Sequence, residues 1–117
     1  MIGDTSIELL SRLFKLLNDS NRLRIIFAIG KEKKPVSEIM EKTDLPQTLV
    51  SFHLRPLRES GLLSTERRGA FIYYYVTEPG FVDLLASLAG VRLKDGDKQQ
   101  EIIFPPMLFM RKWFRGD

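Results

Sequence analysis

Residues 49–63 read LVSFHLRPLRESGLL, a stretch that combines helical spacing of apolar residues with an internal proline and two arginines three positions apart. On a helical wheel, at about 100° per residue, residues 47–60 divide into two faces. The apolar face holds Leu49, Val50, Leu54 and Leu57, with His53, the single histidine of the chain, between them. The opposite face spans roughly 120° and is entirely polar. It comprises Gln47, Thr48, Ser51, Arg55, Arg58 and Glu59, with Phe52 at its border.

The polar face of this predicted helix, about Pro46–Ser60, has two interpretations. A solvated charged face is ordinary for a surface helix. This face, however, holds no lysine, a single acidic residue, and small polar side chains at its N-terminal end. Such an end can approach base edges, while the arginines can reach bases or phosphates. Pro56 removes one backbone hydrogen bond, so we place the important contacts before it.

Three shorter helices are predicted upstream of this stretch. The first spans Ile7–Leu17, where apolar residues recur at helical spacing. Cap-forming residues at 18–21 open the second, which continues to Gly30. The third is marked by Val36, Ile39 and Met40, with Ser37 as its N-cap. A tight turn at residues 44–46 then leads into the helix of residues 46–60, so the pair is predicted to form a helix-turn-helix.

Downstream, Gly61 suits the left-handed end of a helix. Two strand-like runs follow, Leu62–Arg67 and Phe71–Val76, joined by a turn around residues 68–70. They predict a β-hairpin whose tip carries Arg67 and Arg68. A fifth helix opens at residues 79–80 and runs through Ala89. The predicted fold is mostly α with a β-hairpin wing, a winged helix-turn-helix of order α-α-α-α-β-β-α followed by a C-terminal tail.

Composition excludes several classes of function. The chain of 117 residues is long enough for one domain with a core, and 44% hydrophobic with 28% charged residues is typical of a folded globular protein. With no cysteine and one histidine, disulfides, thiolate metal sites and His-based catalytic pairs are not expected. No phosphate-binding glycine loop or nucleophile with a base is recognisable, so we predict no enzyme, no cofactor and no metal.

Charge and hydropathy indicate the location and the partner. The net charge is +3, and residues 47–75 carry four arginines against two glutamates, the largest basic excess along the chain. This local excess favours a nucleic-acid partner. The first ten residues lack a basic leader region, and no apolar run reaches the roughly 18 residues of a membrane span. We therefore expect a cytoplasmic protein without membrane contact.

Four runs of the sequence resemble the ArsR family of bacterial and archaeal transcriptional repressors. They are SNRLRIIFAIG at 20–30, VSEIM at 36–40, LPQTLVSFHLRPLRESGLL at 45–63 and RRGAFIYYYV at 67–76. The resemblance covers about Leu9–Leu88. It implies a sequence-specific regulator of double-stranded DNA, a repressor acting as a homodimer on an inverted repeat. It also implies that the first and last helices build the dimer, so that residues 1–92 form a DNA-binding and dimerisation domain.

The resemblance also implies roles for particular residues. Gln47, Thr48, Ser51 and Phe52 match the base-contacting positions of the family, and Arg67 and Arg68 match its wing. Together with Arg55 and Arg58 on the polar face, they form the predicted DNA-binding set. Phe52 stands where a polar residue is common in the family. An aromatic ring can still touch a thymine methyl group, so the difference indicates an altered sequence preference.

The known inducer sites of the family have no counterpart here. The CxC motif of its arsenic and cadmium sensors would fall on VSEIMEKT, residues 36–43, which offers no thiolate. His53 is expected to be a packed or locally hydrogen-bonded core residue, because no second histidine accompanies it. The signal could be an organic ligand, a protein partner or the abundance of the repressor itself, and these alternatives stay open.

Two further questions stay open from the sequence. The tail, residues 93–117, contains Met107, Phe109, Met110 and Trp113, which could line a ligand pocket, lie on a membrane or cover the partner subunit. We favour the last, with the tail packed on the dimer. The rival to DNA binding is a winged-helix module that docks a protein through the same surface with little DNA affinity.

Overall fold

The structure, a computed structural model, describes residues 2–91 of the chain. The predicted C-terminal tail lies outside the described residues. The helices and strands are α1 (Asp4–Leu17), α2 (Ser20–Ile29), β1 (Lys34–Pro35), α3 (Val36–Thr43), α4 (Gln47–Glu59), β2 (Leu63–Arg68), β3 (Phe71–Val76) and α5 (Phe81–Leu88). This order is a winged helix-turn-helix, as the sequence predicted, with one strand added before α3.

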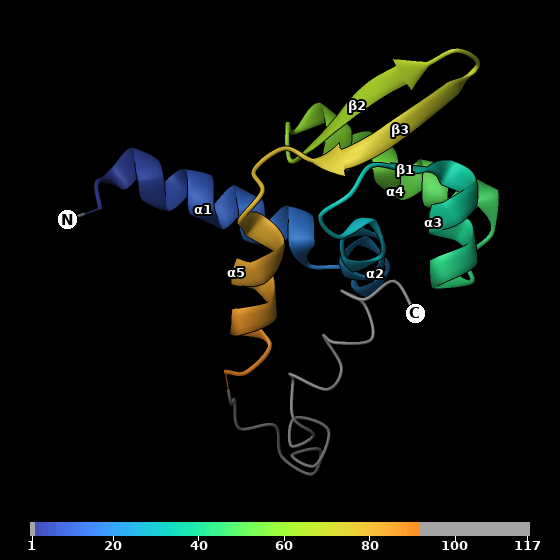
Figure 1. The fold of residues 1–117 in the computed structure, drawn as a ribbon. Helices are drawn as coiled ribbons and strands as arrows, with labels where there is room; N and C mark the ends of the chain where they lie inside the picture. The colour runs from blue at the N-terminus through green and yellow to red at the C-terminus, as the bar shows by residue number, and fades with distance from the viewer. Residues whose placement is uncertain (1, 92–117) are drawn as a thin grey trace, which may run out of the picture.

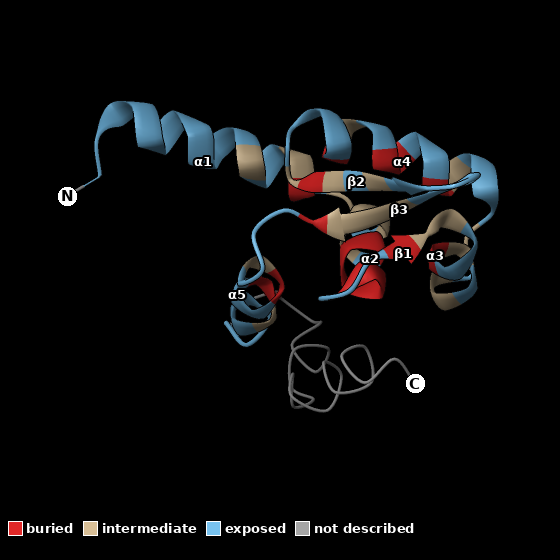
Figure 2. Cartoon of the chain, turned by 45° about the horizontal axis from the view of Figure 1, so that its top comes forward, coloured by how far each residue is buried: buried red, intermediate tan, exposed pale blue. Residues whose placement is uncertain are grey.

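The helices gather around α2, and the hairpin of β2 and β3 extends away from them (Figure 1). In α2, Ile25, Ile26 and Ile29 are fully buried, which makes this helix the centre of the molecule. The other fully buried side chains come from α3, α4, the base of the hairpin and α5: Ile39, Val50, Leu57, Val82 and, at 1–2% exposure, Leu54 and Leu63. Figure 2 shows this core as the buried surface between α2, α4 and the sheet. The helix-turn-helix is therefore fixed to a rigid centre.

The sheet has three strands in the order β1-β3-β2, all antiparallel, and the sequence predicted only two of them. Strand β1 is the short pairing of Lys34 with Tyr74 and Pro35 with Tyr73. It was missed because lysine and proline have low strand propensity, so tertiary pairing decides their conformation. The Lys34 amine is buried and donates to the carbonyls of Ala28 (3.3 Å) and Ile29 (3.0 Å). A cation at the C-terminal end of α2 is favourable there.

The helix and strand boundaries follow the sequence signals with small corrections. Pro35, and not the predicted Ser37, is the N-cap of α3, and no side chain caps this helix. Gly61 has a φ of 87° after α4, the left-handed conformation that the sequence predicted. The hairpin turn is Gly69–Ala70, one residue shorter than expected, with β2 extending to Arg68. Gly69 has a φ of 61°, which a tight hairpin turn requires at its first position.

No helix within residues 2–91 is long and apolar enough to cross a membrane.

Candidate nucleic-acid interface

Helix α4 has one buried and one exposed face. Val50, His53, Leu54 and Leu57 are buried against the core. All six predicted DNA-binding residues of this helix are exposed: Gln47, Thr48, Ser51, Phe52, Arg55 and Arg58. The structure therefore places them together on one outward surface, seen as the exposed side of α4 in Figure 2. We call this surface the α4 face.

The N-terminal end of α4 suits an anionic partner. Its first turn carries no acidic residue, and its N-cap, Pro46, provides no side-chain hydrogen bond. The first backbone N–H groups of a helix lack partners within the helix and carry a partial positive charge. Gln47 and Thr48 stand in this first turn and are exposed. A phosphate or the acceptor edge of a base can approach here without repulsion from a carboxylate.

The arginines of the α4 face differ in their contacts. Arg55 Nε donates to Glu59 Oε2 at 3.1 Å, an exposed pair one helical turn apart. Arg58 makes no side-chain ion pair or hydrogen bond within residues 2–91. An exposed ion pair such as Arg55–Glu59 contributes little to stability, so Arg55 can exchange Glu59 for another anion. Both guanidinium groups can therefore turn toward a phosphate. The helix continues through Pro56 to Glu59, so Arg58 stays on the same element.

The structure separates the two wing arginines. Along β2, Arg67 lies on the same side as Leu63, which is buried at the base of the hairpin in contact with the core beside α4. Arg68 lies on the other side, opposite Phe71. Arg67 has no side-chain partner among the described residues. It is thus the wing cation on the side of the hairpin that turns toward α4.

Arg68 is held by its neighbours on the outer side of the hairpin. Its Nε donates to Glu66, and its guanidinium lies over the ring of Tyr73 at 4.7 Å from the centroid. Lys33 donates to Glu66 at 2.6 Å and lies over the ring of Tyr75 at 4.9 Å. The hydrogen bond from Lys33, followed by that from Arg68, lowers the pKa of Glu66. We call Lys33, Glu66 and Arg68 the wing brace, because they join the loop before β1 to the hairpin.

Phe71 is an exposed aromatic residue of the wing that the sequence did not single out. It stands directly after the turn, opposite Arg68, with 64% of its surface exposed. Tyr73 and Tyr75 share its side of the strand, while Tyr74 packs against the core. Counting back by two from Tyr73 would have found it. An exposed aromatic ring opposite Arg68 can contact a minor groove or a sugar.

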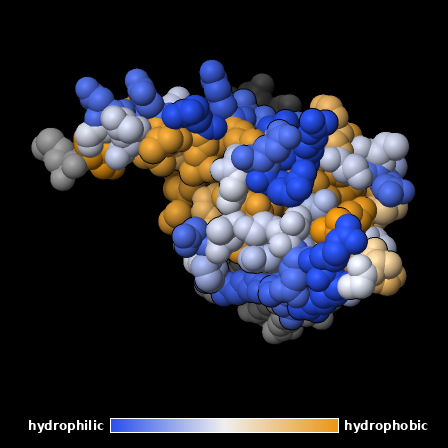
Figure 3. All heavy atoms as spheres, turned by 90° about the horizontal axis from the view of Figure 1, so that it is seen from above, coloured by the Kyte–Doolittle hydropathy of each residue, from blue (hydrophilic) through white to orange (hydrophobic). Residues whose placement is uncertain are grey.

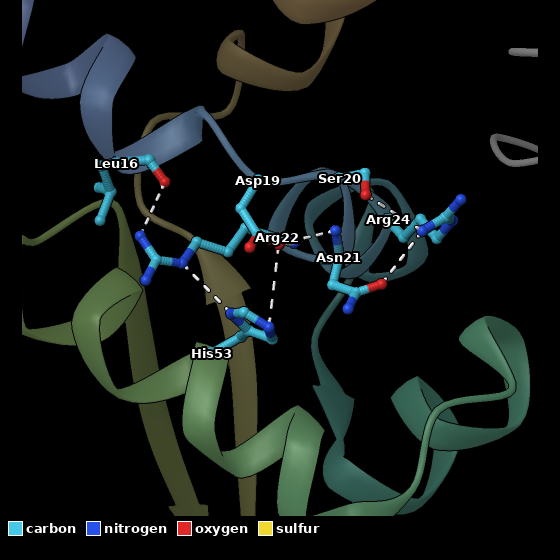
Figure 4. A network of polar contacts seen from close by, with 7 residues as sticks. All are labelled: Leu16, Asp19, Ser20, Asn21, Arg22, Arg24 and His53. Carbon is cyan, nitrogen blue, oxygen red and sulfur yellow. Dashed lines mark hydrogen bonds and ion pairs between the residues drawn. The ribbon is translucent and has the colours of Figure 1, made fainter.

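His53 is a core residue, as the sequence predicted. It is 4% exposed, its Nδ1 accepts a hydrogen bond from Arg22 Nε at 3.3 Å, and its Nε2 lies 3.8 Å from Asp19 Oδ1 (Figure 4). Asp19 is also the N-cap of α2 and accepts from the backbone of Asn21 and Arg22. The backbone hydrogen bond from Arg22 lowers the pKa of Asp19, with smaller contributions from the neighbouring charges. Within the described part of the chain, no cluster of three or more histidine or acidic side chains could hold a metal.

A second surface lies between α1 and α5. It is an apolar groove of about 900 Å³ whose lining includes Leu10, Phe14, Leu23, Phe27, Leu85 and Leu88. Helix α1 carries hydrophilic side chains along one edge and apolar ones along the other, visible in the extension to the left in Figure 3. Phe14 has 53% of its surface exposed, and Leu88 45%. An apolar surface of this kind marks an interaction site. We call it the α1–α5 groove.

The chain is similar in sequence to several bacterial regulatory proteins. A family model described as "bacterial regulatory protein, arsR family" matches residues 19–65. The arsenic resistance transcriptional regulator of Pseudomonas putida is 36% identical over 99 residues, covering 82% of this chain and 73% of that protein. The arsenical resistance operon repressor of Bacillus subtilis is 30% identical over 89 residues, covering 73% and 85%.

A solved structure shares the fold. The homodimeric winged helix-turn-helix DNA-binding domain from Mycobacterium bovis, described as a possible ArsR-family transcriptional regulator, superposes with a TM-score of 0.62. It is 27% identical, and the match covers 74% of this chain and 83% of that one.

Proposed function

Since the chain belongs to the arsR family of bacterial regulatory proteins, we propose that it is a sequence-specific repressor that binds double-stranded DNA as a homodimer on an inverted repeat. The family consists of transcriptional regulators and not of enzymes, in agreement with the sequence prediction. The repressor role is supported by the Bacillus subtilis relative, whose name states it.

The observation that carries the proposal is the α4 face. Gln47, Thr48 and Ser51 lie exposed at the N-terminal end of a helix whose opposite face is fixed in the core. Short polar side chains on a rigid helix end can donate to and accept from base edges in the major groove. Arg55 and Arg58, further along, can hold the backbone phosphates and fix the register of the helix.

The wing supplies a second contact. Arg67 lies on the side of the hairpin toward α4, so it can reach the phosphates or minor groove next to the major groove that α4 enters. Arg68 contributes to a smaller extent, because Glu66 and Tyr73 already hold it. Base reading by α4 and anchoring by the wing together account for a specific and a non-specific component of binding.

The α1–α5 groove is the proposed dimer surface. The homodimer from Mycobacterium bovis supports a two-fold assembly of this fold. A second copy would cover the exposed rings and leucines of α1 and α5, and a two-fold dimer reads two half-sites about one helical turn apart, roughly 34 Å. The predicted packing of residues 93–117 on this dimer is part of the same proposal.

The inducer is not proposed to be arsenic, although two relatives are named for arsenic resistance. Arsenite is a soft acceptor that binds through thiolate ligands. The chain contains no cysteine and therefore offers no thiolate. An organic ligand, a protein partner and the abundance of the repressor itself are the signals compatible with this composition.

Selection of bound sequences from random duplex DNA tests the proposal. We expect enrichment of an inverted repeat whose half-site centres lie about one helical turn apart. Retention on duplex DNA should fall steeply as salt rises. The absence of any enriched sequence, together with weak retention at low salt, would instead support the protein-docking module.

A further inference from the structure

We propose that Arg22 is a positioning residue that fixes the recognition helix α4 relative to α1, and thereby fixes the separation of the two recognition helices in the dimer. The inference rests on the proposed function, because this separation matters only for a dimer that reads two half-sites. It starts from the polar cluster of Figure 4, in which side chains of α2 and α4 meet the end of α1.

The guanidinium group of Arg22 links α1 and α4, two helices with different proposed functions. Arg22 Nη1 donates to the backbone carbonyl of Leu16 at 3.0 Å, in the last turn of α1. Arg22 Nε donates to His53 Nδ1 at 3.3 Å, in the middle of α4. Helix α1 lines the α1–α5 groove, and α4 carries the α4 face. Arg22 therefore connects the proposed dimer surface to the proposed DNA-reading surface.

The hydrogen bond from Arg22 to His53 determines which ring nitrogen of His53 carries the proton. Since an arginine nitrogen can only donate, His53 Nδ1 must accept, and the ring proton lies on Nε2. This nitrogen faces Asp19 Oδ1 at 3.8 Å. The same oxygen accepts from the backbone N–H of Arg22 at 3.1 Å. Asp19 thus holds the backbone of Arg22 while the side chain of Arg22 holds His53, so the three residues form a closed set of contacts.

These hydrogen bonds define the orientation of α4 in a way that apolar packing alone does not. Val50, Leu54 and Leu57 hold α4 to the core through apolar contacts, and the hydrophobic effect behind these contacts has no preferred direction. The planar guanidinium has a fixed fork of donors, so its two hydrogen bonds define one arrangement of the helices. His53 is 4% exposed, which shields the bond from water.

The same cluster orients a predicted base-contacting side chain. The ring of Phe52 packs edge-on against that of His53, with centroids 5.2 Å apart and an interplanar angle of 78°. A shift of His53 would therefore move both α4 and the aromatic ring on its outer face. In a dimer this shift appears twice, once in each protomer. Since each base pair adds about 3.4 Å along the duplex, a dimer with fixed recognition helices should accept one half-site spacing and reject its neighbours.

The test compares duplexes that differ only in half-site spacing. Binding would be measured on the selected inverted repeat, on the same repeat with one base pair added or removed between the half-sites, and on a single half-site. The variants are Arg22→Lys, which keeps the charge but loses the fork, and His53→Leu, which removes the acceptor while keeping an apolar core side chain. Arg24→Lys is the matched control, because the side chain of Arg24 hydrogen-bonds only Ser20 and Asn21, in its own helix, among residues 2–91.

The wild type and Arg24→Lys should lose about tenfold in affinity when the spacing changes by one base pair. Arg22→Lys and His53→Leu should bind all spacings within about threefold of one another, with single half-site affinity near that of the wild type. A spacing preference that survives in both variants overturns the inference. So does an equal loss on every duplex, including the half-site, which would indicate destabilisation alone. If the wild type itself binds no duplex, the proposed function fails, and the inference with it.

Discussion

At the scale of single residues, exposure is less informative than whether a side chain is already engaged. All eight predicted DNA-binding residues are exposed, but their contacts differ. Arg68 belongs to the wing brace, whereas Arg67 and Arg58 have no side-chain partner among residues 2–91. An arginine that must first leave a carboxylate and an aromatic ring contributes less to phosphate binding than a free one. The contacts of Arg67 and Arg68 therefore differ, although the sequence pattern did not distinguish the two residues.

Arg67→Ala should weaken binding to selected and random duplexes alike. It should also lower the slope of log affinity against log salt by about one unit, the amount expected for one lost phosphate contact. Arg68→Ala should change the slope by less, because Glu66 neutralises its charge in the free protein. Salt titrations of both variants, with Arg24→Ala as the control for net charge, measure the difference. Equal slopes for Arg67→Ala and the control would contradict this assignment.

Phe52 should read thymine through its methyl group. Replacing thymine by deoxyuridine at the contacted position of the selected sequence removes that methyl without changing hydrogen bonding. The wild type should lose about fourfold in affinity, which corresponds to about 0.8 kcal/mol for one buried methyl-sized group. Phe52→Ala should bind both duplexes equally. If the wild type is indifferent to deoxyuridine at every thymine of the site, Phe52 has another role.

At the scale of helices and strands, local sequence signals predict the boundaries best where one residue type is needed. Asp19 before α2, Gly61 after α4 and Gly69 in the hairpin stand where caps and positive φ angles require them. Strand β1 and the cap of α3 could not be predicted in this way. Pairing of Lys34–Pro35 with β3, 38–40 residues later in the chain, decides both, and no local pattern reports such a pairing.

The candidate site, too, could be predicted only in part from local sequence patterns. The exposed set on α4 follows from helical periodicity, which the sequence displays directly. The link from Arg22 to His53 spans 31 residues and depends on the packing of α2 against α4, so periodicity identifies His53 as buried without identifying its partner. Likewise, the contact of Arg68 with Tyr73 became apparent only once the register of β2 with β3 was known.

The cap of α2 should make stability depend on pH. Asp19→Ala should lower the free energy of unfolding by about 1 kcal/mol near neutral pH, while Asp19→Asn, which keeps a capping oxygen, should lower it less. The folded-state pKa of Asp19 lies below its ordinary value of 3.8, so the advantage of the carboxylate is present above that value. This advantage is lost as the pH falls through the lower, folded-state pKa.

Denaturant unfolding of the wild type and Asp19→Asn, at about pH 6 and about pH 3, measures this effect. The wild type should lose more stability than the variant between the two conditions. An identical loss in both proteins would mean that Asp19 is not the carboxylate responsible.

At the scale of the whole molecule, the two proposed surfaces lie on different parts of one rigid body. Helices α1 and α5 extend on the opposite side of the body from α3, and the hairpin extends from its top in Figure 1. The α1–α5 groove is apolar, whereas the α4 face is polar and arginine-bearing. Assembly and DNA reading can therefore occur at the same time, connected through α2.

Phe14→Glu should convert the protein to a monomer. The side chain is more than half exposed in the single chain, so the fold should tolerate the change, whereas a carboxylate buried in a dimer interface carries a large desolvation penalty. Phe71→Ser, at an aromatic position on the wing that is also more than half exposed, is the matched control and should stay dimeric. Sedimentation distinguishes the two, and a dimeric Phe14→Glu would place the interface elsewhere.

DNA binding by a variant in which Gln47, Thr48 and Ser51 are all alanine tests most directly whether α4 reads the bases. All three are exposed, so melting temperature should change little, and the salt-dependent binding of random duplex should persist because the arginines remain. With about 1 to 3 kcal/mol for each lost base contact, affinity for the selected sequence should fall by at least about 100-fold, toward that for random DNA. If the variant binds the selected sequence as tightly as the wild type, α4 does not read the bases.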